Sequence, residues 1–235
     1  MQKTKMLYEG KAKIVYETED PQVLIVHFKD DATAGNGAKK GTIQGKGIMN
    51  NKMSEFFFKL LKSHDIETHY IDTLNEREMA VKSLRMIALE VIVRNVAAGS
   101  LSKRLGLPEG TPLNTPVLEY CYKNDELGDP MLNRYHIMAL DLARVHELDE
   151  IEHISFMVNK VLTEFLKTKN INLIDFKLEF GRDDNDKIIL ADEISPDNCR
   201  FWDATTNEKL DKDRFRRDMG GVEEAYHEIL TRITA

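Results

Sequence analysis

The sequence has few of the features that mark secreted, membrane-spanning or disulfide-stapled proteins. Its 235 residues include two cysteines, six prolines and one tryptophan. Two cysteines in a chain of this length indicate reduced structural thiols rather than a disulfide framework. The first residues, MQKTKMLYEGK, lack the apolar segment of a signal peptide, and no apolar run approaches the roughly 20 residues of a membrane-spanning helix. We therefore expect a cytoplasmic protein that does not bind membranes.

The chain also lacks an excess of positive charge. It has 33 lysines and arginines against 40 aspartates and glutamates, so its formal net charge is −7. Broad binding to nucleic acid needs a positive field, and this balance argues against it. Any phosphate-binding site must therefore be built from a local cluster of lysines and arginines.

Several common catalytic signatures are absent as well. The sequence has no G-x-x-x-x-G-K-[ST] phosphate loop, no H-E-x-x-H zinc motif and no G-x-S-x-G nucleophile elbow. The seven histidines are scattered, and the two cysteines do not have the spacing of a zinc site. We interpret the histidines as surface or packing residues.

Hydrophobic periodicity predicts a mixture of strands and helices. The expected strands are 6–9, 13–17, 23–29, 66–72, 78–86 and 88–96, followed by a hairpin of 172–180 and 187–194. The expected helices are 46–63, 99–106, 135–147, 149–168 and 222–232. We expect a mobile, glycine-rich loop at 34–47 and a long surface excursion at 107–134.

Strands and helices do not alternate strictly, which favours an α+β fold over a doubly wound parallel sheet. The amino-terminal third is rich in antiparallel β-structure, and the remainder mixes helices with a hairpin. The length of the chain fits one large domain or two lobes that share a cleft. We place the boundary between two such lobes near residues 80–90, which gives a β-rich lobe at 1–86 and an α+β lobe at 87–235.

Residues 173–181, LIDFKLEFG, alternate charged and apolar side chains. A period of two is typical of a strand, whose successive side chains point to opposite faces. Asp175, Lys177 and Glu179 would then share one face. Burying such a row is costly unless the charges are paired or bound to a ligand. The row is therefore either a solvated face or the lining of a site.

Two more carboxylates, Asp192 and Glu193, lie on the second strand of the predicted hairpin. With a two-residue turn at Asn185 and Asp186, Glu179 falls directly opposite Asp192. Opposed carboxylates repel each other, and a hard cation such as Mg²⁺ would remove the repulsion. A wider loop would instead leave the carboxylates on separate faces in water, and the sequence does not decide between the two.

Basic residues form the remaining clusters. In YEGKAK, Gly10 permits a bend, and Lys11 and Lys13 would share a face of a strand, which suits a polyphosphate. From these residues alone, an edge strand guarded by lysines is the simpler interpretation.

Arginines recur in RNVAAGSL, SPDNCRFWD and DKDRFRR. Arg94 ends an apolar strand, and Ser100 lies at the start of a helix whose free N–H groups favour an anion. Arg200 follows an Asp-Asn turn, and its fork can bind two oxygens at once. Alternatively, Ser100 is a simple N-cap and the arginines of DKDRFRR form a solvated helix face. Together the clusters are what a nucleoside-triphosphate enzyme with an anionic second substrate needs.

With their neighbours, these clusters resemble one family. The matching segments are LYEGKAK, GKGIMNNK, LEVIVRNVAAGSL, LIDFKLEFG, DEISPDNCRFWD and DKDRFRRDMGG. They cover the chain nearly end to end and are similar to the phosphoribosylaminoimidazole-succinocarboxamide synthases, the SAICAR synthetase family. The length of the chain is similar to that of the short, single-function bacterial members.

The resemblance implies an ATP-dependent ligase of purine biosynthesis. Members join the carboxylate of 5-amino-1-(5-phosphoribosyl)imidazole-4-carboxylate to the amine of L-aspartate, and ADP and phosphate are released. The implied fold has two lobes related to ATP-grasp and kinase-like folds, with the nucleotide between them, and the implied assembly is a homodimer. The expected cofactors are ATP as co-substrate and Mg²⁺, and the expected chemistry passes through an acyl phosphate.

The resemblance also implies roles for individual residues. It assigns Lys177 to the phosphoryl group and the reacting carboxylate, and it assigns Glu179 and Asp192 to Mg²⁺. The residues implied for ATP are Lys11, Lys13, Lys82 and Met86. Those implied for the ribotide substrate are Arg94, Ser100, Asp197, Arg200 and Arg216. For Asp175 two roles remain open: contact with the substrate, or support for Lys177.

The 34–47 loop receives no catalytic role in this interpretation. Asn36 stands where some relatives carry aspartate, and the glycines of the loop suggest a flexible lid.

Two other functions fit the same clusters. A related ATP-using ligase or small-molecule kinase would keep the lysines and carboxylates but need not use Arg94, Ser100 and Arg200. A nucleotide-binding regulator would bind ATP without turnover and would not need L-aspartate.

Overall fold

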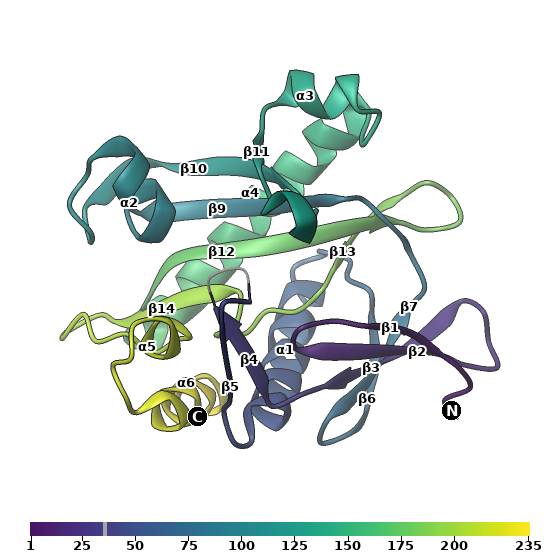
Figure 1. Ribbon diagram of the computed structural model, residues 1–235, viewed down its shortest axis with the longest axis horizontal. Coiled ribbons are helices and arrows are strands. Elements are labelled where there is room, and N and C mark those ends of the chain that lie inside the picture. The colour runs from purple at the N-terminus through teal and green to yellow at the C-terminus, as the bar shows by residue number, and fades with distance from the viewer. Residues whose placement is uncertain (35–36) are drawn as a thin grey trace.

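The computed structural model describes residues 1–34 and 37–235, and two antiparallel sheets dominate it (Figure 1). The first sheet has five strands in the order β1-β2-β3-β7-β6. Their bounds are Met6–Glu9, Lys13–Glu17, Val23–Phe28, Glu78–Lys82 and Tyr70–Asn75. The predicted amino-terminal meander is therefore confirmed.

Helix α1 (Lys46–Lys62) packs against β3 and β6 of the first sheet. It buries Met49, Met53, Phe57 and Leu61, which recur at spacings of four because such residues share one face of a helix. The helix predicted at 46–63 is confirmed.

The second sheet is built around one long strand, β12 (Ile171–Arg182). Its main path is β11-β10-β9-β12-β13, with bounds Met131–Leu132, Pro112–Tyr122, Leu89–Val96 and Ile188–Ala191 for the other four strands. Strands β8 (Arg85–Met86) and β14 (Cys199–Asp203) also pair with β12, at opposite ends. Four strands thus take their positions from β12, the strand that contains LIDFKLEFG.

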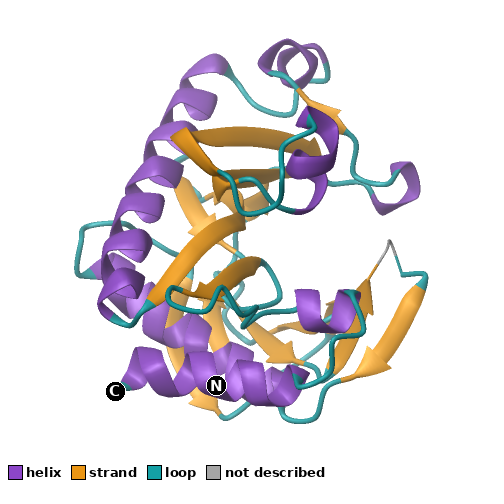
Figure 2. Cartoon of the chain, turned by 90° about the vertical axis from the view of Figure 1, so that its left-hand side faces the viewer, coloured by secondary structure: helices purple, strands orange, loops and turns teal. Residues whose placement is uncertain are grey.

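Helices complete the structure. Helix α4 (Val145–Thr168) packs on β12 and β9, and α6 (Val222–Thr234) packs on α1. The short helices are α2 (Gly99–Leu105), the 3₁₀ turn η1 (Asp125–Leu127), α3 (Arg134–Ala139) and α5 (Asp213–Arg216). Figure 2 shows the long helices on one side of the molecule and the strands of both sheets beside them. This mixed, antiparallel architecture agrees with the predicted α+β class.

One apolar core joins the two sheets. Phe28 and Met79 of the first sheet belong to the same buried cluster as Phe176 and Phe180 of β12. Both cysteines are free and buried, as their number predicted. No described helix is both long enough and apolar enough to cross a membrane.

Three predicted segments are wrong. The expected excursion at 107–134 contains β10, which pairs along β9 from Val117 to Tyr122. The expected loop at 34–47 contains β5 (Lys39–Thr42), which pairs with β4 (Asp31–Ala34). Asn36 lies outside the described residues. The single helix expected at 135–147 is divided, because the chain turns at Asp141, which has a φ of 52°.

Two strand predictions need smaller corrections. The strand expected at 66–72 is β6, which begins at Tyr70 and runs to Asn75. The hairpin of β12 and β13 forms, but Glu179 pairs with Ala191 and not with Asp192. The connecting loop is wider than two residues, because the Asp183 carboxylate accepts hydrogen bonds from the N–H groups of Asn185 and Lys187, both at 2.9 Å.

Glu147 provides a test of how α4 is fixed to the second sheet. Its carboxylate accepts hydrogen bonds from the Arg144 N–H at 2.6 Å and from Arg182 Nη2 at 2.9 Å. We expect Glu147→Gln to lower the free energy of unfolding at pH 7 by about 2 kcal/mol, since charge-assisted bonds to a buried carboxylate are lost. Urea unfolding measures this, and Glu164→Gln on the exposed face of α4 is the control.

The Glu147 effect should depend on pH in a defined direction. The Arg182 hydrogen bond lowers the pKa of Glu147 from 4.5 to about 2 in the folded protein. The stabilisation is therefore complete above about pH 4.5 and is lost as the pH falls through the folded pKa. The difference between wild type and Glu147→Gln should shrink as the pH is lowered from 4.5 towards 2. A difference that is constant over this range would contradict the ionic origin.

Candidate functional site

Three adjoining cavities form a groove between the two sheets. The apolar cavity, of about 320 Å³, is lined by Met86 and its neighbours. The carboxylate cavity, of about 220 Å³, is lined by Lys177 and several carboxylates. The arginine cavity, of about 490 Å³, is lined by Arg94 and two other arginines. The first two share Glu179 in their walls, and the last two share Lys177. All the residues predicted for a site line at least one of these cavities.

The apolar cavity lies against one face of the first sheet. Its wall is formed by Val15, Leu24, Val26, Val81 and Leu84. These side chains project from β2, β3 and β7 and the turn after β7. Lys82 and Met86 lie at its edge, and the Lys82 Nζ is 4.0 Å from the Glu67 carboxylate. Charged residues stand mainly at the end where this cavity meets the carboxylate cavity, so it suits an apolar, planar group.

The carboxylate cavity holds an alternating network of charges. Lys177 Nζ is 3.1 Å from Asp192 Oδ2 and 3.3 Å from Glu90 Oε1, and it also donates to Glu179. Lys13 donates to Asp192 and lies 3.0 Å from Glu193 Oε1. The predicted row of charges on β12 is therefore the lining of a cavity and not a solvated face.

The charges of this network hold each other ionised. Burial alone would lower the pKa of Lys177, but Asp192, Glu179 and Glu90 raise it well above its ordinary value. Burial alone would raise the pKa of Asp192, but Lys13, Lys177 and Lys123 bring it well below its ordinary value. At neutral pH the Lys177 side chain is thus an ammonium group that donates hydrogen bonds to the surrounding carboxylates.

Asp192 reaches this network although the ladder does not place it opposite Glu179. It follows the last residue of β13 and has a φ of 65°. His69 fixes this bend, because its Nε2 lies 3.0 Å from the Asp192 carbonyl oxygen. Burial, followed by the nearby charge of Lys13, lowers the pKa of His69 to about 4, so the neutral imidazole donates this bond. The two carboxylates therefore meet on Lys177 and not across the strand pair.

The arginine cavity is organised by Asp175. The Asp175 carboxylate accepts from Arg94 Nη1 at 2.8 Å and from Arg200 Nη1 at 2.8 and 3.0 Å. Both contacts follow from strand pairing, because β9 places Arg94 opposite Asp175 and β14 places Arg200 there. Arg94 also donates to Ser100 Oγ at 3.1 Å. Two guanidinium groups are thus held side by side, which is the arrangement that binds a phosphate.

Two further predicted residues approach this cavity from the carboxyl-terminal part of the chain. Arg216 of α5 donates to Asp213 at 2.6 Å, and Asp213 also accepts from Arg200 at 3.0 Å. The side chain of Asp197 is only 5% exposed, and its carboxylate accepts from Lys46 at 2.6 Å and from Tyr226 at 2.6 Å. Asp197 therefore anchors the wall of the cavity to α1 and α6.

The sequence suggested that Lys11 and Lys13 share one face of a strand, but only Lys13 belongs to a strand. Lys13 begins β2 and points into the network around Asp192. Lys11 lies in the turn before β2 and contacts Asp125 at 2.7 Å. The two lysines therefore serve different parts of the groove.

Several residues of the groove are not among those predicted from the sequence. Glu90 could have been found, because it precedes Arg94 by four residues on β9 and shares its face. Lys123, which donates to Glu179, and Asp125 lie in the segment taken for a surface excursion, where no periodic pattern pointed to them.

The donor set of the carboxylate cavity fits Mg²⁺ bound together with a phosphate. Glu179 and Asp192 present hard carboxylate oxygens around the same ammonium group, Lys177 Nζ. Among residues 1–34 and 37–235, no group of three or more His, Cys, Asp or Glu side chains is arranged to hold a metal ion. Mg²⁺ usually takes one or two protein carboxylates and completes its shell with water and phosphate oxygens.

Comparison with known proteins gives one consistent result. The family model described as SAICAR synthetase matches residues 6–233. The chain is 65% identical over 230 residues to the phosphoribosylaminoimidazole-succinocarboxamide synthase of Clostridium novyi, covering 98% of this chain and 97% of that protein. It is 59% identical to the same enzyme of Coprothermobacter proteolyticus, covering 99% of both chains.

Solved structures agree with the sequence comparison. The crystal structure of the synthase from Ehrlichia chaffeensis matches with a TM-score of 0.96 and 46% identity, over 98% of this chain and 99% of that one. A SAICAR synthetase in complex with ADP matches with a TM-score of 0.94 and 54% identity, over 97% of both chains. On its sequence, its fold and the full length of these matches, the chain belongs to the SAICAR synthetase family.

Proposed function

We propose that the three cavities carry the family's reaction, each holding one part of it. The chain is an ATP-dependent ligase of purine biosynthesis. It joins the carboxylate of 5-amino-1-(5-phosphoribosyl)imidazole-4-carboxylate to the amine of L-aspartate. The observation that supports the proposed arrangement best is the position of Lys177, which lies in the wall between the carboxylate and arginine cavities.

ATP would occupy the apolar and carboxylate cavities. The adenine ring would lie in the apolar cavity beside Lys82 and Met86, and the phosphates would extend towards Lys13. The similarity to a synthetase in complex with ADP supports nucleotide binding in this groove. The first sheet would then belong to a nucleotide-binding lobe, 1–86, and the second to an α+β lobe, 87–235, in a relationship like that of ATP-grasp and kinase-like folds.

The ribotide would occupy the arginine cavity. Its phosphate would be bound by Arg94, Arg200 and Ser100, which already converge there. Arg216 would add charge from α5, and Asp197 would support the wall from below. This orientation directs the imidazole carboxylate along β12 towards Lys177.

The chemistry requires activation of a carboxylate, which is a poor acyl donor. In the proposed first step, an oxygen of the ribotide carboxylate bonds to the γ-phosphorus while the bond from that phosphorus to ADP breaks. In the second, the amine of aspartate attacks the acyl carbon, an amide C–N bond forms and the bond from that carbon to the phosphate oxygen breaks; the proton lost by the nitrogen leaves with the phosphate. The Lys177 ammonium stabilises the negative charge that accumulates on the transferred group. Mg²⁺, held by Glu179 and Asp192, would neutralise charge on the phosphates.

The proposal also covers the location of the protein in the cell and its oligomeric state. A role in purine biosynthesis is consistent with a cytoplasmic enzyme. We also propose that the protein is a homodimer, and sedimentation equilibrium would measure its mass directly.

A coupled assay tests the function. ADP release should require the ribotide, L-aspartate and Mg²⁺ together, and chelation by EDTA should abolish it. Release with the ribotide alone, at the same rate, would indicate a small-molecule kinase. Nucleotide binding without release under any of these conditions would indicate a regulator.

Lys177→Ala separates catalysis from nucleotide binding. We expect kcat to fall by roughly 100-fold or more, since one donor to the developing charge is lost. The Kd of ATP, measured by calorimetry, should change far less because the apolar cavity is intact. Lys167→Ala, on the exposed face of α4, is the control. An unchanged kcat would remove Lys177 from the mechanism.

Arg200→Ala addresses recognition of the ribotide. We expect the KM of the ribotide to rise about 10- to 100-fold, because the variant loses a charge-assisted hydrogen bond worth about 1.5–3 kcal/mol. The KM of ATP should stay near the wild-type value. Arg217→Ala is a matched control, because Arg217 also contacts Asp213 but does not line the arginine cavity. Equal KM changes in both variants would indicate that Arg200 acts only by holding α5.

A further inference from the structure

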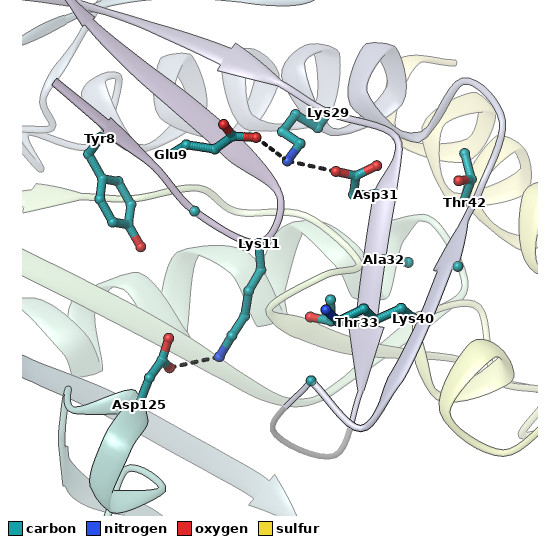
Figure 3. A pocket seen from close by; sticks show the side chains of 13 residues that line it. Tyr8, Glu9, Lys11, Lys29, Asp31, Ala32, Thr33, Lys40, Thr42 and Asp125 are labelled. Atoms are coloured by element: carbon teal, nitrogen blue, oxygen red, sulfur yellow. Dashed lines mark hydrogen bonds and ion pairs between the residues drawn. The ribbon is translucent and has the colours of Figure 1, made fainter. Parts of the chain in front are cut away.

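A fourth cavity adjoins the groove on the side of the β4–β5 hairpin. We call it the hairpin cavity; it measures about 720 Å³ and is lined by Lys11, Thr33, Lys40 and Asp125, among others (Figure 3). It shares Lys11 and Thr33 with the arginine cavity. It shares Lys11 and Asp125 with the carboxylate cavity. A molecule in the hairpin cavity would therefore lie next to the reacting groups.

An ion pair stands where these cavities meet. Lys11 reaches from the turn before β2 to Asp125 of η1, with Nζ and Oδ1 separated by 2.7 Å, as Figure 3 shows. The side chains are 46% and 65% exposed, and a pair this exposed contributes only about 0–1 kcal/mol. A ligand can therefore separate the two charges at little cost and contact both of them.

A second cation is available inside the hairpin cavity. Lys40 extends from β5 beside Thr33 (Figure 3). Within the described part of the chain, its ammonium group forms no hydrogen bond or ion pair. Lys29 differs, because its Nζ is already shared between Glu9 at 2.8 Å and Asp31 at 2.6 Å. The cavity thus offers two lysines that can take new partners and one carboxylate that can do the same.

The charges of the hairpin cavity match the remaining substrate. The apolar cavity suits the adenine ring, and the paired guanidinium groups of the arginine cavity suit a phosphate. L-Aspartate carries two carboxylates and one ammonium group, so it needs two cations and one anion. Lys11, Lys40 and Asp125 supply this set beside the carboxylate cavity.

We propose that L-aspartate binds in the hairpin cavity by inserting into the Lys11–Asp125 ion pair. Its ammonium group contacts Asp125, one carboxylate contacts Lys11 and the other contacts Lys40. This assignment rests on the proposed function, and it transfers Lys11 from the ATP phosphates to the amino-acid substrate. Because Asp125 lies in the wall shared with the carboxylate cavity, the nitrogen of aspartate is held on the side nearest to Lys177.

Asp125→Asn tests the contact with the ammonium group. Initial rates should give a KM for L-aspartate at least about tenfold above wild type, with KM values for ATP and the ribotide within about twofold. Glu126→Gln removes the same charge from the next residue, which is exposed and lines none of these cavities, so its kinetics should match wild type.

Succinate distinguishes recognition from a change of shape. It has both carboxylates of aspartate but no ammonium group, and it should inhibit competitively against L-aspartate. Asp125→Asn should leave its inhibition constant within about twofold of wild type while the KM of aspartate rises. If both constants rise by the same factor, Asp125 only shapes the cavity and its proposed role is wrong.

The lysines should show the complementary pattern. Lys40→Met and Lys11→Met should raise the KM of aspartate and the inhibition constant of succinate together, each at least about tenfold, since both molecules carry the carboxylates. A rise in the KM of ATP alone in Lys11→Met would return Lys11 to the phosphates and overturn the proposal. The ligase function is tested separately, by whether ADP release from the wild-type protein requires aspartate. If it does, the proposed function stands even when the variants show that aspartate does not bind in the hairpin cavity.

Discussion

The site depends on one constraint: a partly buried ammonium group, that of Lys177, must be surrounded by negative charge. Lys177 meets this requirement through Glu90 of β9, Glu179 of β12 and Asp192 just beyond β13. Three neighbouring segments must therefore end or align at one point. The same constraint acts on Asp175, whose carboxylate is buried and holds two arginines. Strand β12 carries both centres, two positions apart, and so sets the spacing between the arginine cavity and the carboxylate cavity.

These pairings also keep the groove ready for its ligands. Arg94 and Arg200 are held side by side because both donate to the Asp175 carboxylate. In the proposed arrangement, the substrate phosphate would contact the same two guanidinium groups. Side chains that are held in place lose little conformational freedom when a ligand binds, so more of the interaction energy appears as affinity. The Lys11–Asp125 pair differs, since both side chains are exposed to solvent and their separation costs little.

The sequence predicted local features better than long-range ones. The alternation in LIDFKLEFG predicted a strand. The cost of burying its charges indicated that they form either a solvated face or the lining of a site. The register with Asp192 was wrong, because the loop between the strands is set by hydrogen bonds of Asp183 that periodicity does not reveal. Lys123 and Asp125 were missed because the Pro- and Asn-rich segment before them hides β10, which is stabilised by pairing with β9. Contacts between distant segments are not encoded in any short window of the sequence.

The shared core has a consequence for how the chain folds. Phe28 and Met79 of the first sheet pack into the same cluster as Phe176 and Phe180 of β12. A fragment that ended at residue 86 would expose this apolar surface to water, and the remaining fragment would expose the matching one. The two sheets should therefore unfold in a single cooperative transition, and the groove between them exists only while both halves of the chain are folded together.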